Sequence, residues 1–334
     1  MEKYIAKKLK SPVFIKYIVR HVSVKAKERL KECGDFLMFL GDNTMEKLKL
    51  KTGDFCGNRF CPMCAWRQAK KDSLKISILM QYIKIEKDKE FIFLTLTTPN
   101  VQGFELNDEI KKFNKSFERL IKRKEVRAIV KGYIRKLEVT YDKHERITEK
   151  LYEKKKNYFD KRNLSVGDKN PTYDTYNPHF HIVIAVNKTY FTDKDYYLSQ
   201  DRWLNLWRES TGDRSITQVS VKKVRANDRK EVSELAKYGA KDADYLTSQG
   251  VFDIFYKALK GKQILTYNGL FKDAVVLFKD GKLDKYKMKD PTEYVYMLLY
   301  KWGFGNYVEE EIRELTEEEY NKVNKELIDE IDID

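Results

Sequence analysis

The sequence has few histidines and prolines and no long hydrophobic run. It contains 4 histidines, 6 prolines and 4 cysteines among 334 residues. Because it lacks a stretch of about 18 consecutive apolar residues, we expect no membrane-spanning helix. The opening residues MEKYIAKK lack the apolar core and cleavage site of a signal peptide. We therefore expect a cytoplasmic protein with no membrane partner.

Positive charge is what the chain has in excess, with a formal net charge of +14 at pH 7. The charge is unevenly spread. Residues 309–334 contain 12 Asp and Glu against 3 Lys and Arg, so they carry −9 and residues 1–308 carry +23. Such an excess attracts polyanions and predicts a nucleic acid partner, with an anionic membrane surface as the weaker alternative. The acidic C-terminal segment is expected to be a solvated, frayed helix.

The four cysteines are spaced as metal ligands rather than as a disulfide framework. Cys56, Cys61 and Cys64 lie on a short turn that contains Gly and Pro, and Cys33 lies upstream. In a reducing compartment, thiolates at this spacing favour a tetrahedral structural zinc site with Cys33 as the fourth ligand. His21 is an alternative fourth ligand. The alternative to a metal site is a set of buried, inert cysteines.

Basic side chains near the cysteines and at the end of a later strand are candidate DNA contacts. The helix predicted at 67–82 begins with a basic stretch that is well placed to touch phosphates. The candidate contacts are Arg59, Arg67, Lys70, Lys71, Lys222, Lys223 and Arg225. The alternative is that they form an ordinary solvated helix face and strand end.

The order of the predicted elements indicates an α+β fold with helices packed on a largely antiparallel sheet. We expect a basic, cysteine-rich accessory and DNA-binding domain at 1–85, a main domain at 86–250, and a C-terminal extension with an acidic tail at 251–334. A charged segment at 144–176 is expected to be a long, mobile hairpin insertion. The chain has no GxGxxG motif, P-loop or internal repeat. The predicted elements of the main domain are strands at 91–100, 133–141, 180–186 and 216–221 and helices at 107–124, 197–209 and 229–246.

Two of the four histidines, His179 and His181, stand at the head of a predicted strand. Because alternate residues of a strand face the same side, the two imidazoles project together while Phe180 and Ile182 face the core. Two histidines and one carboxylate can hold a divalent cation and leave positions open for substrate oxygens. Glu138, on a strand expected to neighbour the histidine strand, is the candidate third ligand. The alternatives are two solvated histidines and a surface carboxylate.

The predicted helix at 229–246 brings a carboxylate, a phenol and an ammonium to one face. Glu234, Tyr238 and Lys241 are spaced three or four residues apart, and Tyr245 lies one heptad beyond Tyr238. A phenol has a pKa of about 10, so a tyrosine that attacks a phosphodiester needs a cation to stabilise the developing charge. Lys241 could neutralise that charge, and Glu234 could activate a water as general base. The alternative is a surface helix with ordinary charge pairs and a packing tyrosine.

Three segments, in order along the chain, resemble the motifs of HUH-type rolling-circle plasmid replication initiators. They are FLTLTTPN at 93–100, NPHFH at 177–181 and ELAKYGAK at 234–241. The cysteine segment CGNRFCPMC at 56–64 looks like that family's upstream signature. The ordered co-occurrence of these segments is more specific than any one of them. The resemblance implies an HUH endonuclease-like antiparallel sheet and an enzyme that is a strand-specific DNA nickase and strand transferase.

By this resemblance, Tyr238 would cut one strand at a single-stranded or hairpin nick site in the plasmid's double-strand origin and remain joined to the 5′ phosphate. The freed 3′ hydroxyl would prime the host polymerase, with a host helicase as a further partner. His179 and His181 would bind Mn²⁺ or Mg²⁺, whereas Glu138 is carried over less directly because the third ligand varies in the family. Glu234 would act at termination, and a second transfer by Tyr245 stays open.

Other functions remain open from the sequence. A relaxase or a single-tyrosine transposase would use the same chemistry, although the cysteine cluster and the Glu-x-x-x-Tyr-x-x-Lys spacing favour a plasmid initiator. A non-catalytic, zinc-containing DNA-binding regulator would explain the charge and the cysteines but not the tyrosine helix. A homodimer is also left open. Trp203 and Trp207 could stack on unpaired bases, but the apolar helix stripe that they share favours core packing.

Overall fold

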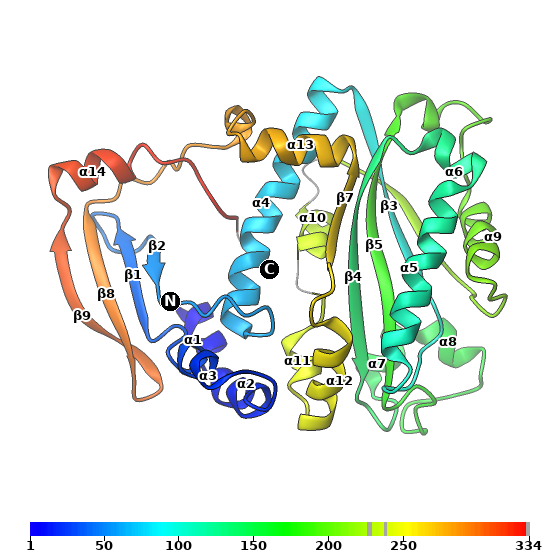
Figure 1. The fold of residues 1–334 in the computed structure, drawn as a ribbon, viewed down its shortest axis with the longest axis horizontal. Helices are drawn as coiled ribbons and strands as arrows, with labels where there is room; N and C mark the ends of the chain where they lie inside the picture. The colour runs from blue at the N-terminus through cyan, green and yellow to red at the C-terminus, as the bar shows by residue number, and fades with distance from the viewer. Residues whose placement is uncertain (226–228, 237–238, 332–334) are drawn as a thin grey trace. The chain divides into compact units, whose positions relative to one another are not determined.

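The computed structural model describes residues 1–225, 229–236 and 239–331 and divides into two compact units, which are described separately (Figure 1). Both units combine helices with antiparallel strand pairs, as the predicted α+β class requires. The division into three domains stays a prediction. The first unit comprises Met1–Lys89, Arg225–Tyr238 and Gly269–Asp334, and the second comprises Glu90–Val224 and Gly239–Asn268.

The first unit contains an antiparallel sheet whose strands come from distant parts of the chain. Strand β1 (Phe36–Gly41) pairs with β2 (Leu48–Gly53) on one side and with β8 (Tyr296–Gly303) on the other. β8 in turn pairs with β9 (Asn306–Glu314), so the sheet order is β2-β1-β8-β9 (Figure 1). Leu37 of β1 is fully buried in this unit. The N-terminal strand β1 and the C-terminal strand β8 therefore belong to one hydrophobic core, which the burial of apolar β1 side chains stabilises.

A long helix, α4 (Pro62–Glu86), is the helix against which other helices of the first unit pack. Pro62 stands in its first turn, where a proline costs no hydrogen bond, and the helix extends beyond the predicted 67–82 at both ends. α4 packs against α1, α10 and α13. No helix in the described part of the chain is both long and apolar enough to cross a membrane. The other helices of this unit are α1 (Glu2–Lys8), α2 (Ser11–Ile18), α3 (Val24–Lys31), α10 (Arg229–Ala236), α13 (Leu270–Lys279) and the 3-10 turn η2 (Asp284–Tyr286).

The acidic C-terminal segment is folded rather than frayed. After β9, helix α14 (Glu317–Val323) begins with a capping box in which the Glu319 backbone donates to the Thr316 hydroxyl and the Thr316 backbone donates to the Glu319 carboxylate. Glu330 forms an ion pair with Lys70 of α4 at 2.5 Å. The expected helix is present and most of its side chains are exposed, but its start is capped and the segment after it pairs with α4, so the expectation of fraying is not supported in the described part.

The second unit is built on a five-stranded sheet in the order β6-β3-β5-β4-β7 (Figure 1). The pairs β3–β6 and β4–β5 are antiparallel. The strands predicted around 91–100, 133–141 and 180–186 match β3, β4 and β5, whereas the strand expected at 216–221 begins only at Ser220. The strands are β3 (Lys89–Thr97), β4 (Gly132–Asp142), β5 (Thr175–Asn187), β6 (Ser220–Val224) and β7 (Leu265–Gly269).

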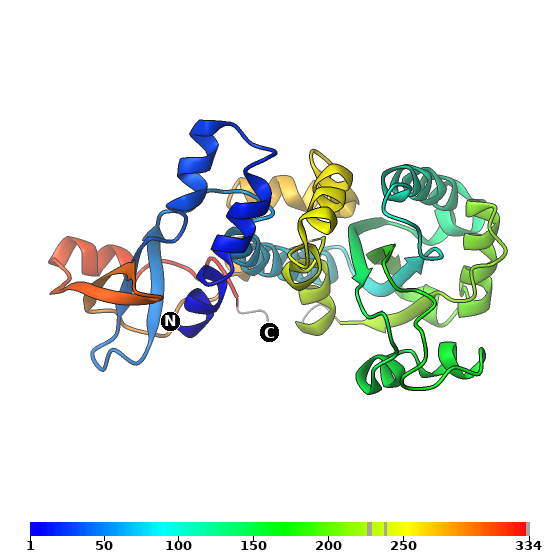
Figure 2. The same ribbon diagram turned by 90° about the horizontal axis from the view of Figure 1, so that it is seen from below.

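Helices α5 and α9 lie on the same side of this sheet (Figures 1 and 2). Phe113 of α5 stacks on Phe180 of β5 with ring centroids 4.1 Å apart and meets Trp207 of α9 edge-on at 5.3 Å. Trp203 and Trp207 are fully buried, and the Trp207 indole donates to the Thr97 carbonyl at 2.8 Å. The preference for core packing over base stacking is therefore confirmed. The helices of this unit are α5 (Leu106–Lys122), α6 (Lys124–Ile129), α7 (Glu149–Lys154), α8 (Lys156–Asp160), η1 (Lys188–Phe191), α9 (Gln200–Thr211), α11 (Asp242–Tyr245) and α12 (Gln249–Leu259).

The single helix predicted at 229–246 is wrong. Helix α10 ends at Ala236, and α11 begins at Asp242 with Lys241 as its N-cap. Between them, Gly239 is not helical, and its carbonyl accepts a hydrogen bond from the backbone of Val139 at 2.7 Å. At Gly239, a backbone hydrogen bond to strand β4 therefore takes the place of a helical hydrogen bond.

The insertion joins the paired antiparallel strands β4 and β5 and has one further antiparallel bridge, Arg146–Lys169, as a hairpin would, but it also contains a small helical substructure that was not expected. It contains α7 and α8 and has its own hydrophobic cluster of Ile147, Leu151 and Phe159, against which other partly buried side chains pack. A long charged segment can therefore fold here, because a few apolar residues supply a local core.

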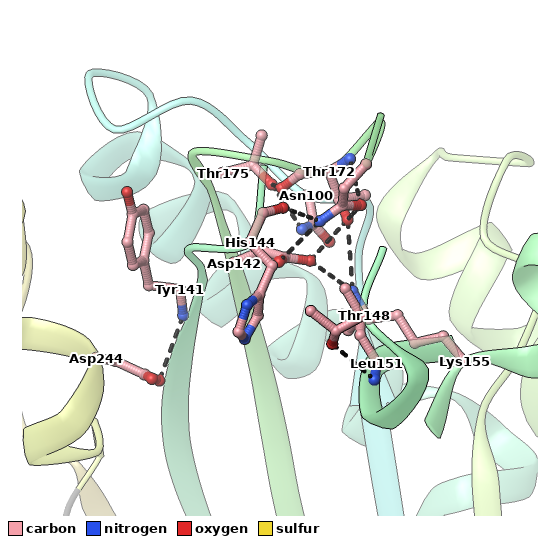
Figure 3. Close-up of polar contacts among 11 residues, drawn as sticks. Asn100, Tyr141, Asp142, His144, Thr148, Leu151, Lys155, Thr172, Thr175 and Asp244 are labelled. Atoms are coloured by element: carbon pink, nitrogen blue, oxygen red, sulfur yellow. Dashed lines mark hydrogen bonds and ion pairs between the residues drawn. The ribbon is translucent and has the colours of Figure 1, made fainter. Parts of the chain in front are cut away.

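The base of the insertion is held by the Asp142 carboxylate at the end of β4 (Figure 3). This carboxylate accepts from the Lys155 ammonium and the Thr172 hydroxyl, each at 2.7 Å, and from the Asn170 amide at 3.0 Å. Burial on its own would raise the pKa of Asp142, but the bonds from Lys155 and Thr172 hold it below its usual value. One side chain thus joins the start, the middle and the end of the insertion.

Candidate active site and cysteine cluster

Strand β5 carries the two candidate histidines, and strand β4 carries the candidate carboxylate. In the β4–β5 register, Glu138 lies opposite His179 and Lys136 lies opposite His181. Their four side chains share one face, because alternate residues of paired strands point the same way. Phe180, between the histidines, points to the other face and is fully buried against α5. The predicted orientation of the histidine pair is therefore confirmed.

The three candidate metal ligands converge on one point. The Nε2 atoms of His181 and His179 lie 3.2 and 3.6 Å from Oε2 of Glu138. One ligand atom from each residue lies within 4.8 Å of the others. Two imidazole nitrogens and one carboxylate oxygen suit a divalent cation that keeps positions open. The structure groups the three residues as the sequence predicts, and their role as ligands stays a prediction.

Neighbouring polar groups orient both imidazoles. Nδ1 of His179 lies 3.3 Å from the carbonyl oxygen of Asn177, so it must carry the proton to make this hydrogen bond. Nδ1 of His181 lies 3.3 Å from the hydroxyl of Thr95 on β3. In both rings the Nε2 atom then faces Glu138. A metal-binding histidine usually coordinates the ion through one ring nitrogen, while an outer polar group holds the other ring nitrogen.

Burial and charge set the protonation states in this cluster. Burial would raise the pKa of Glu138, but the Lys136 ammonium and the two neighbouring imidazoles hold it well below its usual range. Burial lowers the pKa of His181, and the Glu138 carboxylate opposes that shift. The resulting ionised carboxylate and neutral imidazole are the forms that bind a metal ion.

The four cysteines form a second cluster, in the first unit. The sulfur of Cys33 lies 3.6 Å from that of Cys61 and 3.5 Å from that of Cys64, and the Cys56 and Cys64 sulfurs are 3.6 Å apart. All four are free cysteines, as predicted against a disulfide framework. Around a zinc ion with bonds of about 2.3 Å, tetrahedral sulfurs lie about 3.8 Å apart, so this spacing fits zinc. The group that could hold a metal consists of the four cysteines and does not include His21.

Local structure brings the sulfurs together. Cys33 follows helix α3, and the backbone N–H of Cys56 points to its sulfur at 3.4 Å. Cys61 is the N-cap of α4, and Cys64 lies in the first turn of that helix. Hydrogen bonds among the thiols hold the pKa of Cys64 well below its usual value but raise the pKa values of Cys56 and Cys61. Without a metal, the four sulfurs thus share protons, and zinc binding would release them.

The candidate DNA contacts in the first unit differ in accessibility. Arg59 and Lys71 are exposed. The Arg67 guanidinium lies 3.5 Å over the Phe55 ring, and Lys70 is buried in its ion pair with the C-terminal segment. The Lys70 ammonium is therefore not presented to a phosphate in this structure.

The candidate DNA contacts at β6 are exposed, but they do not all face the same way. Lys222 lies opposite Phe93 in the sheet, with its ammonium 5.6 Å from that ring, and the Phe93 and His181 rings are 5.6 Å apart. Lys222 is therefore on the face of the sheet that carries the candidate metal ligands. Lys223 points to the opposite face, with its ammonium 4.2 Å from the Phe191 ring. Arg225 is exposed beyond the end of the strand.

The residues of the predicted tyrosine helix are not on one helix. Tyr238 lies outside the described residues. Glu234 is half-buried on α10 of the first unit, whereas Lys241 and Tyr245 belong to the second unit. Tyr245 is 1% exposed and meets Phe252 and another phenylalanine of α12 edge-on, which is a packing role.

The segment that follows Tyr238 in sequence is hydrogen bonded to the strand that carries Glu138. The backbone N–H groups of Val139 and Tyr141 on β4 donate to the Gly239 carbonyl at 2.7 Å and to the Asp244 carboxylate at 3.4 Å (Figure 3 shows the second bond). A Cβ atom at position 239 would lie 2.7 Å from the Leu137 carbonyl oxygen. Close approach to β4 therefore requires glycine at this position.

Three residues of the histidine–carboxylate cluster were missed from the sequence. Lys136 could have been found, because it stands two residues before Glu138 on a strand and must share its face. Thr95 and Asn177 lie inside two of the motif segments, but no pattern identified them as ring partners. Their roles depend on strand register, which the sequence does not state.

Comparisons with known proteins agree with the motifs. The model of a family described as "Replication protein" (Rep_1) matches residues 47–307. A "Protein rep" from Staphylococcus aureus is 51% identical over 249 residues, which cover 75% of this chain and 96% of the relative. A "Protein rep" from Streptococcus pneumoniae serotype 2 is 34% identical over 253 residues, covering 74% and 70%. No solved structure matches the chain. The chain therefore belongs to the Rep_1 family of replication proteins, which confirms the plasmid replication initiator that its motifs predicted.

Proposed function

We propose that the protein starts rolling-circle replication by nicking one DNA strand at the double-strand origin of a plasmid. The observation that carries the proposal is the convergence of Glu138, His179 and His181 in a chain of this family. Tyr238 is the proposed nucleophile. A non-catalytic zinc-containing regulator is disfavoured, because DNA binding alone does not require a mostly buried centre of two histidines and a carboxylate.

In the proposed step, the phenolic oxygen of Tyr238 attacks the scissile phosphorus. The bond from phosphorus to the 3′ oxygen breaks as the bond to the phenolic oxygen forms. The phenol gives up its proton, and the departing 3′ oxygen gains one. The 5′ phosphate stays on the protein, and the 3′ hydroxyl can prime the host polymerase while a host helicase opens the duplex.

The candidate metal ligands have distinct roles in this proposal. Mn²⁺ or Mg²⁺ bound by them would polarise the scissile phosphate and stabilise the charge that develops in transit. His179 and His181 offer nitrogen donors, and Glu138 offers an ionised oxygen. Lys222, on the same face of the sheet, is the candidate contact for a neighbouring phosphate.

The attachment of Gly239 supports a nucleophile that acts at this centre. Gly239 directly follows Tyr238 in sequence, and its carbonyl is bonded to the residue after Glu138. A larger side chain at position 239 would collide with β4, so glycine permits the close approach. We propose Tyr238, the residue before Gly239 in sequence, as the group that attacks a phosphate held at the histidine–carboxylate centre.

The metal-dependent step can be tested with single-stranded DNA that contains the plasmid's own origin. In Mn²⁺, the wild type is expected to cut the strand and to form an adduct that survives denaturant, and EDTA should stop both. His181→Ala removes one ligand and is expected to slow cleavage by about 10³-fold, since the metal contributes several kcal/mol to stabilising the transition state. His144→Ala, the same change at an exposed histidine on the insertion, is the matched control and should cleave normally. Normal cleavage by His181→Ala would refute this metal centre.

Glu234 is proposed to act at termination, where it would activate a water that releases the protein from DNA. Glu234→Gln should therefore cut at a rate close to that of the wild type but remain joined to DNA, with release slowed by about 10²-fold. Release is measured as the decay of the preformed adduct. Equal decay rates for the variant and the wild type would remove Glu234 from this role and leave Tyr245 to be tested.

We also propose that the four-cysteine cluster holds a structural Zn²⁺. Its support is the grouping of four free cysteines whose sulfurs all lie within 4.8 Å of one another, three of the distances being 3.5 to 3.6 Å. Zinc would then fix the start of α4 and the chain that follows α3.

A further inference from the structure

Lys136 is a fully buried lysine inside the candidate active site. Its side chain is 1% exposed, and its ammonium lies 3.3 Å from Oε2 of Glu138, which is itself 5% exposed. The same Oε2 atom faces Nε2 of His179 and of His181. One carboxylate oxygen therefore lies within 3.6 Å of an ammonium and of two imidazole nitrogens, all on one face of the β4–β5 pair.

Stability alone does not account for a lysine at this position. Removing an ammonium and a carboxylate from water costs several kcal/mol for each ion, and replacing a buried ion pair by apolar residues is often neutral or stabilising. The neighbouring positions on the other face of β4, such as Leu137 and Val139, are filled by apolar side chains that are nearly fully buried. A charge held on the ligand face of the strand therefore indicates a role in the chemistry of that face.

The ammonium changes the charge of the centre. The ionised Glu138 carboxylate carries −1, and the paired Lys136 ammonium brings the sum to zero. With a divalent cation bound, the centre carries +2 instead of +1. A phosphodiester under attack goes from one negative charge to two, so an extra fixed positive charge stabilises the transition state more than the ground state. The same charge repels the metal ion and weakens its binding.

We propose that Lys136 is a positioning residue of the metal centre: it orients the Glu138 carboxylate toward the histidines and makes the centre more positive, favouring phosphate over tight metal binding. The proposal rests on the metal-dependent nicking proposed above. It predicts opposite effects of one substitution, namely tighter metal binding and slower cleavage. A purely structural lysine would not produce this combination, because its loss would weaken both.

The test is a titration of the full-length protein with Mn²⁺, in which free Mn²⁺ is followed by its electron paramagnetic resonance signal. Lys136→Gln keeps a hydrogen-bond donor for Glu138 but removes the charge, and it should bind Mn²⁺ about tenfold more tightly than the wild type. Lys136→Arg keeps the charge and should stay within about threefold of the wild type. Glu138→Gln, which removes a ligand, is the control that assigns the measured binding to this centre.

Cleavage of origin DNA is measured on the same preparations at saturating Mn²⁺. Lys136→Gln should be slower by about 10²-fold, and Lys136→Arg should recover most of that loss. Unchanged or weaker Mn²⁺ binding by folded Lys136→Gln would overturn the proposal. If that variant does not fold, Lys136→Met is tested in the same way, and failure of both to fold would assign Lys136 to stability alone and also overturn it. The Mn²⁺ titration does not depend on nicking. A wild type that never forms an adduct would refute the proposed function, but the comparison of Mn²⁺ binding between the variants would still stand.

Discussion

Tyr238→Phe is expected to reduce strand cleavage by about 10⁵-fold or more and to abolish the covalent protein–DNA adduct. Phenylalanine keeps the ring but removes the only oxygen that can attack phosphorus at this position, so no other group can restore the step. Binding of origin DNA should remain close to that of the wild type, because the basic surface is unchanged. The measurement is a gel assay that resolves intact strand, cut strand and adduct in denaturant, with a separate binding assay.

The matched control for this prediction is Tyr245→Phe. The Tyr245 ring is buried and packs edge-on against Phe252 and a neighbouring phenylalanine of α12, so the variant loses a hydroxyl but little packing. We expect it to nick DNA and form the adduct at a rate within a few-fold of the wild type. Loss of the adduct in Tyr245→Phe with full activity in Tyr238→Phe would reassign the nucleophile.

Cys64→Ser is expected to release one zinc ion per chain and to abolish cooperative unfolding of the first unit. Cys64 lies next to the sulfurs of Cys33 and Cys56, and structural zinc sites of this kind contribute about 10 kcal/mol or more to folding. A serine hydroxyl is a poor zinc ligand, so the segments before α4 would lose the bond that joins them. Zinc content by elemental analysis and thermal unfolding by circular dichroism measure the two effects.

His21→Ala is the matched control for the zinc prediction, because His21 was the other candidate for the fourth ligand. Zinc content and the unfolding transition should both stay as in the wild type, since the group that could hold a metal contains Cys33 and not His21. A wild type that contains no zinc after purification without chelators, or a Cys64→Ser variant that keeps its zinc, would contradict the proposed zinc site.

Local patterns were enough to predict the strands that carry the candidate metal ligands. Period-two alternation placed His179 and His181 on one face and Phe180 in the core, as the structure has them. Glu138 was a choice among carboxylates, and it lies near the histidines because it pairs with His179 across the sheet. That register depends on how two strands meet, and the alternation of each strand alone does not determine it.

The errors occurred where contacts distant in sequence override local preference. The helical pattern at 229–246 gave no sign of the break at Gly239, which arises because that backbone bonds to Val139, a hundred positions earlier. The helices of the charged insertion were not expected, because they are short and the insertion's anchor is one carboxylate, Asp142, bonded to residues 13 to 30 positions away. Lys70 was predicted to be a surface residue that contacts DNA, but it forms an ion pair with Glu330, which lies 260 positions later in the sequence.

The central claim is that Tyr238 becomes covalently joined to DNA at the nick. The most direct measurement is mass spectrometry of the adduct, after nuclease and protease digestion, to identify the residue that carries the nucleotide. The wild type, incubated with Mn²⁺ and single-stranded origin DNA, should yield one peptide with a 5′-phosphonucleotide on Tyr238. A nucleotide on any other residue would contradict the assignment of the nucleophile. Tight DNA binding with no modified peptide, across several metals and origin sequences, would contradict the nickase itself.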